Sequence, residues 1–423
     1  METILKRTKS CPLSVLASGV DPAGTVVLLP PHTKRIMDLE FTNNRWVDIQ
    51  RFSEITSGPL PLLRTLNINA IWGIDPNNPD TLHPLFSGAV GLKELCLHSE
   101  APPFLNRFVF PNLTSFDLSV TSGERFCGSK LLDFLEASPM LQAVDVKIDT
   151  GLSLGGVPRD RVVILQHVES FCLTANDGGP GYKLATHISC PSVKKTLLTY
   201  TSEGRPYNVP PPETFPASDL LNAIIHQYTR SPIKGVKLDI TDLYDFIAWY
   251  LTFQSTDMTI IEFCFHIDRD YSIPESFSGE IFSKACETIR GLPLLANVKH
   301  LHIDGLGVES ESITQIAHDV GGLLKSLGPL EELTICDCNM QPWFLYYPEI
   351  VGYPPIRVLT LTDLSDTLEG DAARGLLKLA KSQHELGMPL ERVTVHSYGS
   401  LADLEELLRP WVGAVDCVLY DEF

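Results

Sequence analysis

The 423-residue sequence contains no run of about 18 consecutive apolar residues, so it predicts no membrane-spanning helix. Lys6, Arg7 and Lys9 stand near the N-terminus, but no apolar segment long enough for a secretory signal peptide follows them. Basic residues are also few. There are 33 lysines and arginines against 52 aspartates and glutamates, which gives a formal net charge of −19. Nucleic acids and anionic membranes are therefore not expected as partners. The charge is interpreted first as a source of solubility, with an acidic docking surface as the alternative.

Three common signatures of catalytic and cofactor sites are missing as well. The chain has no G-x-x-x-x-G-K-[ST], no G-x-G-x-x-G and no H-E-x-x-H. The glycine-rich stretch 176–181 lacks the Lys-Ser/Thr pair of a phosphate-binding loop, so it is predicted to be a turn. We expect a protein that is not an enzyme and uses no cofactor.

The ten cysteines do not have the pattern of a disulfide framework or a zinc finger. Several lie inside strand-like segments, as Cys96, Cys172 and Cys264 do, whereas a secreted framework would place them in loops at paired spacing. Cys336-Asp337-Cys338 is not C-x-x-C. These features predict reduced thiols in a cytoplasmic or nuclear protein, without a native metal site.

One short pattern, L-x-x-L-x-L, does recur along the chain. Its clearest copies are Leu63-x-x-Leu66-x-Ile68, Leu92-x-x-Leu95-x-Leu97, Leu113-x-x-Phe116-x-Leu118, Leu330-x-x-Leu333-x-Ile335 and Ile356-x-x-Leu359-x-Leu361. Several copies follow a turn signal such as Pro61-Leu62, Pro111-Asn112 or Pro139-Met140. A unit of this kind cannot bury its apolar face alone, so it must stack on further copies.

The central apolar residue of each copy can be used as a marker. The markers are Leu39, Leu66, Leu95, Phe116, Val144, Phe171, Thr196, Val236, Phe263, Leu301, Leu333, Leu359, Val393 and Val415. Most gaps lie near the about 20–29 residues of a leucine-rich repeat. The longest gaps, from Thr196 to Val236 and from Phe263 to Leu301, leave the alignment open to a shift of one repeat in that region.

Helical spacing between markers predicts helices around 131–135, 220–225, 313–327, 376–380 and 404–408, the last with a capping box formed by Ser400 and Asp403. Alternating strands and helices predict parallel pairing. The expected fold is an α/β leucine-rich-repeat-like solenoid, or horseshoe, with strands on the concave face and helices on the convex face. We expect a single domain, 1–423, with an N-terminal lead-in at 1–30 and loops at 151–160 and 176–181. The Pro-rich stretch 201–216 is interpreted as a loop of that domain, with a domain linker as the alternative.

The segment Leu5-Lys6-Arg7-Thr8-Lys9-Ser10-Cys11-Pro12-Leu13-Ser14-Val15 resembles an element of F-box proteins from mushroom-forming (basidiomycete) fungi, in which repeats of this kind follow an F-box. Pro61-Leu62-Leu63-Arg64-Thr65-Leu66 resembles their repeat strands. The resemblance implies the substrate-receptor half of a cullin–RING ubiquitin-ligase subunit. No F-box is found in the chain. The chain alone is therefore not expected to bind the cullin adaptor, which becomes a partner only if an F-box lies upstream.

The repeat register also predicts a binding patch. In x-L-x-L-x, the x residues should point to the concave face. Three segments then present Glu262, Cys264 and His266; His300, His302 and Asp304; and Glu332, Thr334 and Cys336. If these strands are neighbours, about 4.8 Å apart, their side chains form one patch. The predicted partner-binding residues are Glu262, His266, His300, His302 and Asp304. The alternatives are a zinc site and an ordinary solvated strand face.

The expected function is protein recognition, with a partner that the sequence does not identify. The alternative is a non-enzymatic scaffold or sensor unconnected with ubiquitin.

Overall fold

The structure is a computed structural model of the whole chain. It describes residues 10–18, 30–45, 60–72, 89–99, 109–121, 126–149, 151–176, 178–201, 218–242, 246–268, 277–304, 313–336, 354–364, 371–397 and 402–419. Within these ranges the protein is an α/β protein with seven α-helices and a long, mostly parallel sheet of sixteen strands. The chain divides into two compact units, Met1–Tyr200 and Thr201–Phe423.

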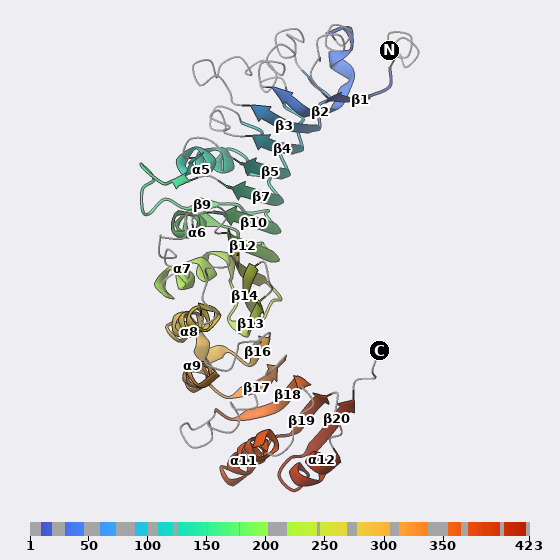
Figure 1. Ribbon diagram of the computed structural model, residues 1–423. Helices are drawn as coiled ribbons and strands as arrows, with labels where there is room; N and C mark the ends of the chain where they lie inside the picture. The colour runs from blue at the N-terminus through green and yellow to red at the C-terminus, as the bar shows by residue number, and fades with distance from the viewer. Residues whose placement is uncertain are drawn as a thin grey trace. The chain divides into compact units, whose positions relative to one another are not determined.

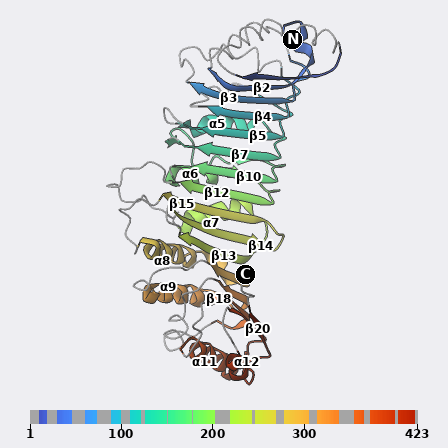
Figure 2. The ribbon, with the colours of Figure 1, turned by 45° about the vertical axis from the view of Figure 1, so that its right-hand side comes forward.

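The first unit holds eight sheet strands, and each pairs in parallel with the next (Figures 1 and 2). In spatial order they are β1 (Leu13–Ser18), β2 (Ile36–Arg45), β3 (Thr65–Trp72), β4 (Glu94–Ser99), β5 (Ser115–Val120), β7 (Ala143–Ile148), β10 (Ser170–Ala175) and β12 (Lys195–Thr201). Its helices are α5 (Gly128–Glu136), α6 (Gly178–Thr186) and the 3-10 helix η1 (Pro30–Arg35). Two short parallel pairs join β6 (Phe126–Cys127) to β8 (Leu152–Ser153), and β9 (Val163–Ile164) to β11 (Ile188–Ser189).

The second unit also holds eight sheet strands. In spatial order they are β15 (Ile260–Asp268), β14 (Phe246–Ser255), β13 (Ile233–Asp242), β16 (His300–Asp304), β17 (Leu330–Ile335), β18 (Ile356–Leu364), β19 (Arg392–Ser397) and β20 (Ala414–Leu419). The pairs β13–β14 and β14–β15 are antiparallel, and the other pairs are parallel. The helices are α7 (Ser218–Tyr228), α8 (Phe277–Arg290), α9 (Ile313–Ser326), α11 (Asp371–Glu385), α12 (Ala402–Leu408) and the 3-10 helix η4 (Pro293–Asn297).

The predicted repeat register is confirmed for every marker except Phe263, whose strand pairs antiparallel with β14. All fourteen markers lie in strands, and markers on adjacent parallel strands are direct cross-strand partners. One row of partners is Leu39, Leu66, Leu95, Phe116, Val144, Phe171 and Thr196. A second row is Val236, Leu301, Leu333, Leu359, Val393 and Val415. Register is set by which face of each strand is buried, and the recurring apolar positions fix that face.

Burial explains why this register is favourable. Leu95, Leu97, Leu333 and Leu359 are each at most 2% exposed, as predicted. The lead-in turns are confirmed too. In the copies that begin at Leu63, Leu92 and Leu113, the first leucine donates its backbone N–H to the carbonyl three residues earlier, as in Leu63 to Leu60, at 3.1 Å. The helices of each unit lie along one side of its strands, so the apolar faces of strands and helices meet there (Figure 1).

Four elements differ from the sequence prediction. The stretch 176–181 was predicted to be a turn, but α6 begins at Gly178. Pro180 is tolerated there because the N–H groups in the first turn of a helix have no helical partner. Leu184 and Ala185 of this helix are fully buried, which stabilises it. Helix α8 and strand β14 were not predicted at all. The loop predicted at 151–160 contains the two-residue strand β8. The other predicted helices are present, whereas Ser400 and nearly all of the Pro-rich stretch lie outside the described residues.

Candidate functional site

The candidate site lies on the face of the second unit's sheet where polar residues alternate with the buried markers. Two rows of cross-strand partners cross this face. One contains Gln254, Gly235, His300 and Glu332, and the other contains Thr252, Lys237, His302 and Thr334. Each side chain is placed by a strand with two neighbours, because β14, β13, β16 and β17 all lie inside the sheet. The positions of these groups are therefore fixed by backbone hydrogen bonds on both sides.

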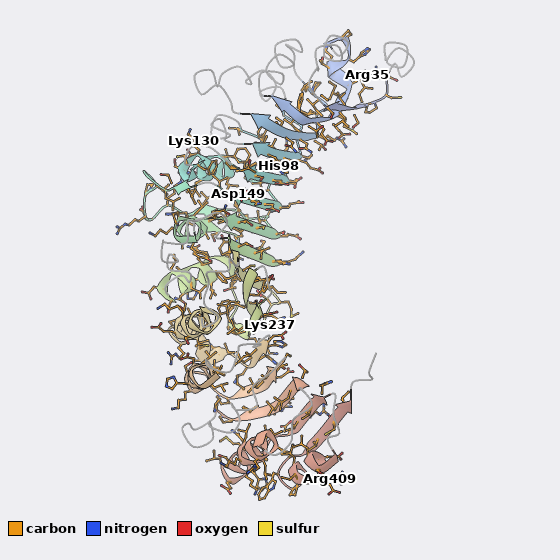
Figure 3. The ribbon with its side chains drawn as sticks, viewed as in Figure 1. Arg35, His98, Lys130, Asp149, Lys237 and Arg409 are labelled. Carbon is orange, nitrogen blue, oxygen red and sulfur yellow. The ribbon has the colours of Figure 1, made fainter. Side chains whose placement is uncertain are left out.

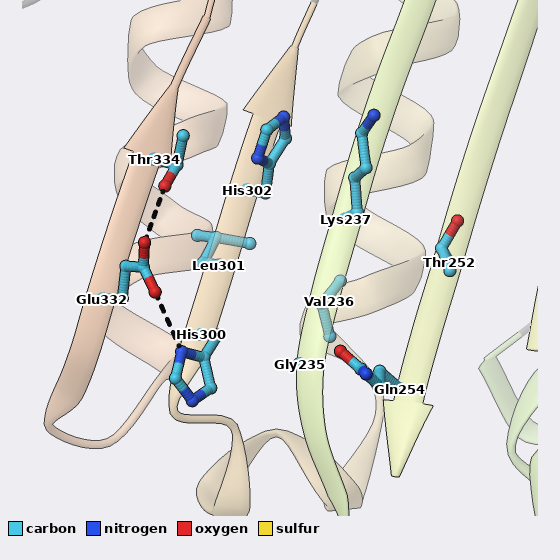
Figure 4. Close-up of a pocket in the computed structure, with 10 residues that line it drawn as sticks. All are labelled: Gly235, Val236, Lys237, Thr252, Gln254, His300, Leu301, His302, Glu332 and Thr334. Carbon is cyan, nitrogen blue, oxygen red and sulfur yellow. Dashed lines mark hydrogen bonds and ion pairs between the residues drawn. The ribbon is translucent and has the colours of Figure 1, made fainter. Parts of the chain in front are cut away.

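A pocket of about 290 Å³ opens between these rows. Figure 4 shows Gln254 and His300 on either side of Gly235, where the absence of a side chain leaves space. A Cβ at Gly235 would lie 3.6 Å from the Cβ of Gln254 and 3.8 Å from that of His300, which is ordinary van der Waals contact. Gly235 therefore shapes the pocket but is not required by a close approach of the backbone.

The charged groups of the pocket hold one another in place. His300 Nδ1 lies 3.3 Å from Glu332 Oε2, and Thr334 donates its hydroxyl to Glu332 Oε1 at 3.4 Å (Figure 4). Lys237 Nζ lies 3.0 Å from Asp239 Oδ2 and 3.6 Å from Asp304 Oδ2. Partial burial lowers the pKa of Lys237, but the two carboxylates outweigh it and raise that pKa above its usual value. The lysine is therefore a permanent cation beside the pocket.

The structure brings together only part of the predicted patch. His300, His302 and Asp304 share β16, and Glu332 and Thr334 lie on the neighbouring β17, as predicted. The assumption that β15 neighbours β16 is wrong, because β14 and β13 lie between them. Thr252 and Lys237 therefore separate Glu262 from His302 along the row. The side chain of His266 lies outside the described residues, although its backbone belongs to β15.

The missed strand also explains the missed pocket residues, which are Gly235, Lys237, Thr252 and Gln254. The signal was present in the alternation Ile247-x-Trp249-x-Leu251-x-Phe253. This alternation has the period of a strand but no L-x-x-L lead-in, so the repeat pattern does not predict the strand. The interval from Val236 to Phe263 was interpreted as one repeat with its crossover. It holds the additional strand β14 instead, which runs antiparallel to its neighbours in the sheet.

The pocket offers groups for orientation rather than an evident reaction centre. One thiol lies close to a residue of its lining, since Cys336 Sγ is 3.7 Å from His302 Nε2. One catalytic pattern does occur elsewhere, because Gly151-Leu152-Ser153-Leu154-Gly155 fits G-x-S-x-G. That pattern needs a strand, a sharp turn and a helix around the serine. Ser153 instead ends the two-residue strand β8, and its Oγ accepts the N–H of Gly155 at 3.4 Å. We therefore assign no nucleophile there.

Comparison with known proteins adds no identity to this geometry. No protein-family model matches the chain, and no match is found among curated proteins. Among the described helices, none is long and apolar enough to cross a membrane.

Proposed function

We propose that this protein is a recognition scaffold that binds a protein partner on the polar sheet face of its second unit. The observation that carries the proposal is the pocket between β14, β13, β16 and β17, with its polar groups held by neighbouring strands. The narrower architecture belongs to the same proposal: a leucine-rich-repeat-like solenoid whose concave face carries this site. The in-register marker rows support it, because stacked copies of one unit produce rows of this kind.

The size and lining of the pocket favour a partner's side chain over a small-molecule cofactor. Its volume of about 290 Å³ lies just below the about 300–1,000 Å³ typical of small-molecule pockets. Lys237 and Gln254 supply donors, and Glu332 supplies acceptors, so a polar side chain can be oriented from two directions. Groups held on rigid strands lose little conformational entropy when a partner binds, which favours affinity.

The first prediction concerns three residues of this face. The combined variant Lys237→Ala, His302→Ala, Glu332→Ala should keep its fold, since all three side chains are partly exposed, as the burial of each position indicates. It should lose the proteins that co-purify with the wild-type chain. For an isolated partner, the dissociation constant should rise about 30-fold or more if central hot spots are among the three. Affinity purification with mass spectrometry identifies the partner, and a binding titration then measures the change.

Two further variants sharpen this test. Gly235→Ala should also weaken binding, because it fills pocket space with a methyl group without a clash and removes no charge. Thr360→Ala with Thr394→Ala is the matched control, since these threonines continue the row of Thr334 on β18 and β19, beyond the pocket. Retention of every partner by the triple variant would show that this face is merely solvated.

The ubiquitin-ligase role is the narrower form of the proposal. It rests on the sequence resemblance, of which the stretch before Ser10 lies outside the described residues. Sequencing the transcript upstream of Met1 separates the two forms. An in-frame helical segment rich in Leu and Pro with a Trp-rich tail favours the ubiquitin-ligase receptor. A transcript without one favours a scaffold unconnected with ubiquitin.

A further inference from the structure

A cluster of metal-ligand types lies on the sheet face of the first unit, apart from the site proposed above. Cys96 and His98 are two residues apart on β4, so both side chains point to the same face of the sheet. Asp117 on β5 is the direct cross-strand partner of Cys96. His98 marks the position of the cluster in Figure 3. The side chains of His98 and Asp117 are 39% and 47% exposed, which leaves the cluster open to an ion from solution.

One donor atom from each of the three side chains lies within 4.8 Å of the other two, and each pair of side chains brings donor atoms close to the separations of tetrahedral metal ligands. Cys96 Sγ is 3.4 Å from His98 Nε2 and 3.7 Å from Asp117 Oδ2, and His98 Nε2 is 3.3 Å from Asp117 Oδ1. Zinc bonds of about 2.3 Å to sulfur and about 2.0–2.2 Å to nitrogen and oxygen place tetrahedral ligand atoms about 3.3–3.6 Å apart. Little side-chain movement is needed to enclose an ion. Hydrogen bonds between these groups have similar lengths, so the distances alone do not distinguish a metal site from a hydrogen-bonded cluster. The charge around the cluster does distinguish them.

The charge around the cluster favours a cation. Asp145 on β7 is the cross-strand partner of Asp117, and Glu40 on β2 adds a third carboxylate to the field at Cys96. Among the described residues, Asp117 forms an ion pair with His98 and with no lysine or arginine. A divalent ion would supply the missing positive charge.

A similar set in the second unit provides an internal comparison. His302, Asp304 and Cys336 also bring their donor atoms together. There, however, Lys237 Nζ lies 3.6 Å from Asp304 Oδ2, so an ammonium group already neutralises the carboxylate and repels a metal ion. The two clusters share their ligand types and differ in this cation. A difference in metal binding between the two clusters would therefore result from the charge around them and not from the types of ligand.

We propose that Cys96, His98 and Asp117 form a binding site for a divalent transition-metal ion, with zinc as the ion that best suits this mixed sulfur, nitrogen and oxygen set. Three protein ligands leave one tetrahedral position for a water molecule or for Asp145. The bound ion would tie β4 to β5 on the face opposite the helices. The proposal does not rest on the function proposed for the second unit.

The test uses the full chain, purified under reducing conditions and stripped of metal. Zn²⁺ is titrated in competition with a chromogenic chelator, and Co²⁺ is titrated separately as a spectroscopic probe. The wild type should bind one zinc ion at this site and give a thiolate-to-cobalt charge-transfer band. Cys96→Ser should abolish the band and weaken zinc binding by about 100-fold or more, and His98→Gln should weaken it similarly, because loss of a direct ligand exceeds the 10–100-fold effect of outer-shell partners. Cys336→Ser is the matched control and should change neither result.

Thermal unfolding provides an independent measurement. Zinc should raise the melting temperature of the wild type, because a ligand that binds only the folded state stabilises it, and should leave that of Cys96→Ser unchanged. The metal-free forms of both proteins should unfold alike, which shows that the serine variant is folded. The proposal is overturned if wild type and Cys96→Ser bind zinc equally, or if Cys336→Ser alone removes binding. In either case the first cluster is a hydrogen-bonded group without a metal.

Discussion

Replacing Phe116 by alanine is expected to lower the free energy of unfolding of the first unit by about 3–5 kcal/mol. Phe116 is a repeat marker on β5 and is 1% exposed. Its ring centroid lies 4.5 Å from that of Phe134 on α5, so one side chain joins the sheet to its helix layer. The substitution removes this aromatic contact and leaves a cavity where the strand and helix meet. Urea unfolding followed by far-UV circular dichroism measures the change.

Val109→Ala is the control for this substitution. Val109 is 65% exposed and lies just before the strand-entry turn at Phe110, so its truncation should change the free energy by less than about 0.5 kcal/mol. Phe134→Ala should be nearly as costly as Phe116→Ala. The double variant should then cost less than the sum of the two, because each single change already removes the contact between the rings. Equal stability of Phe116→Ala and Val109→Ala would mean that sheet and helix are not packed together here.

The strand positions could be predicted from the sequence because each copy of the repeat must satisfy two conditions at the same time. Each copy alternates apolar and polar residues, and each must present its apolar side to the same layer as its neighbour does. Phe116 and Leu333, for example, are far apart in the chain but occupy equivalent positions of their units, each in a row of markers. A register slip of one residue would turn the whole apolar set to the opposite face. The register was therefore predictable even where individual copies, such as that of Thr196, are weak.

Strand order was predictable only where the repeat is regular. A repeat predicts that copies adjacent in sequence are adjacent in space. This fails between Val236 and Phe263, because β14 lies between β13 and β15, and between Phe263 and Leu301, because β14 and β13 lie between β15 and β16. No local feature of β15 reveals this. Its own sequence fits the pattern, and only its antiparallel partner changes its place. Gly235 and Lys237 consequently occupy the positions beside His300 and His302 where the sequence had placed Glu262 and Cys264.

This exchange alters the chemistry of the candidate site. Glu262 and Cys264 beside the histidines would have made an acidic patch with a thiol, which suits a metal ion, whereas Lys237 contributes a cation paired with Asp239 and Asp304. The sheet strands described in the first unit keep regular parallel order, and there the sulfur, imidazole and carboxylate groups of neighbouring copies meet with no lysine paired to Asp117 among the described residues. Cys96, His98 and Asp117 occupy x positions of two neighbouring copies, so the repeat register itself places them on one face of the sheet.

Leu333→Ala should lower the free energy of unfolding of the second unit by about 2–5 kcal/mol. Leu333 is 1% exposed and lies in its row between Leu301 and Leu359, which are equally buried. Both neighbours are held by parallel strands, so they cannot move far to fill the space that the leucine leaves. Leu333→Ile keeps the volume and should cost less than about 1.5 kcal/mol. The difference in free energy of unfolding between the two variants therefore measures the contribution of packing in this row.

Leu386→Ala supplies the matched control, since Leu386 follows α11 in the same unit and is 58% exposed. Its loss should change the free energy of unfolding by less than about 0.5 kcal/mol. If Leu333→Ala and Leu386→Ala shift the urea midpoint equally, the apolar row is not the core of the second unit, and the pocket residues on the opposite face of its strands are not fixed as proposed. If only Leu333→Ala shifts it, the buried row is what holds His300, His302 and Lys237 in register on the binding face.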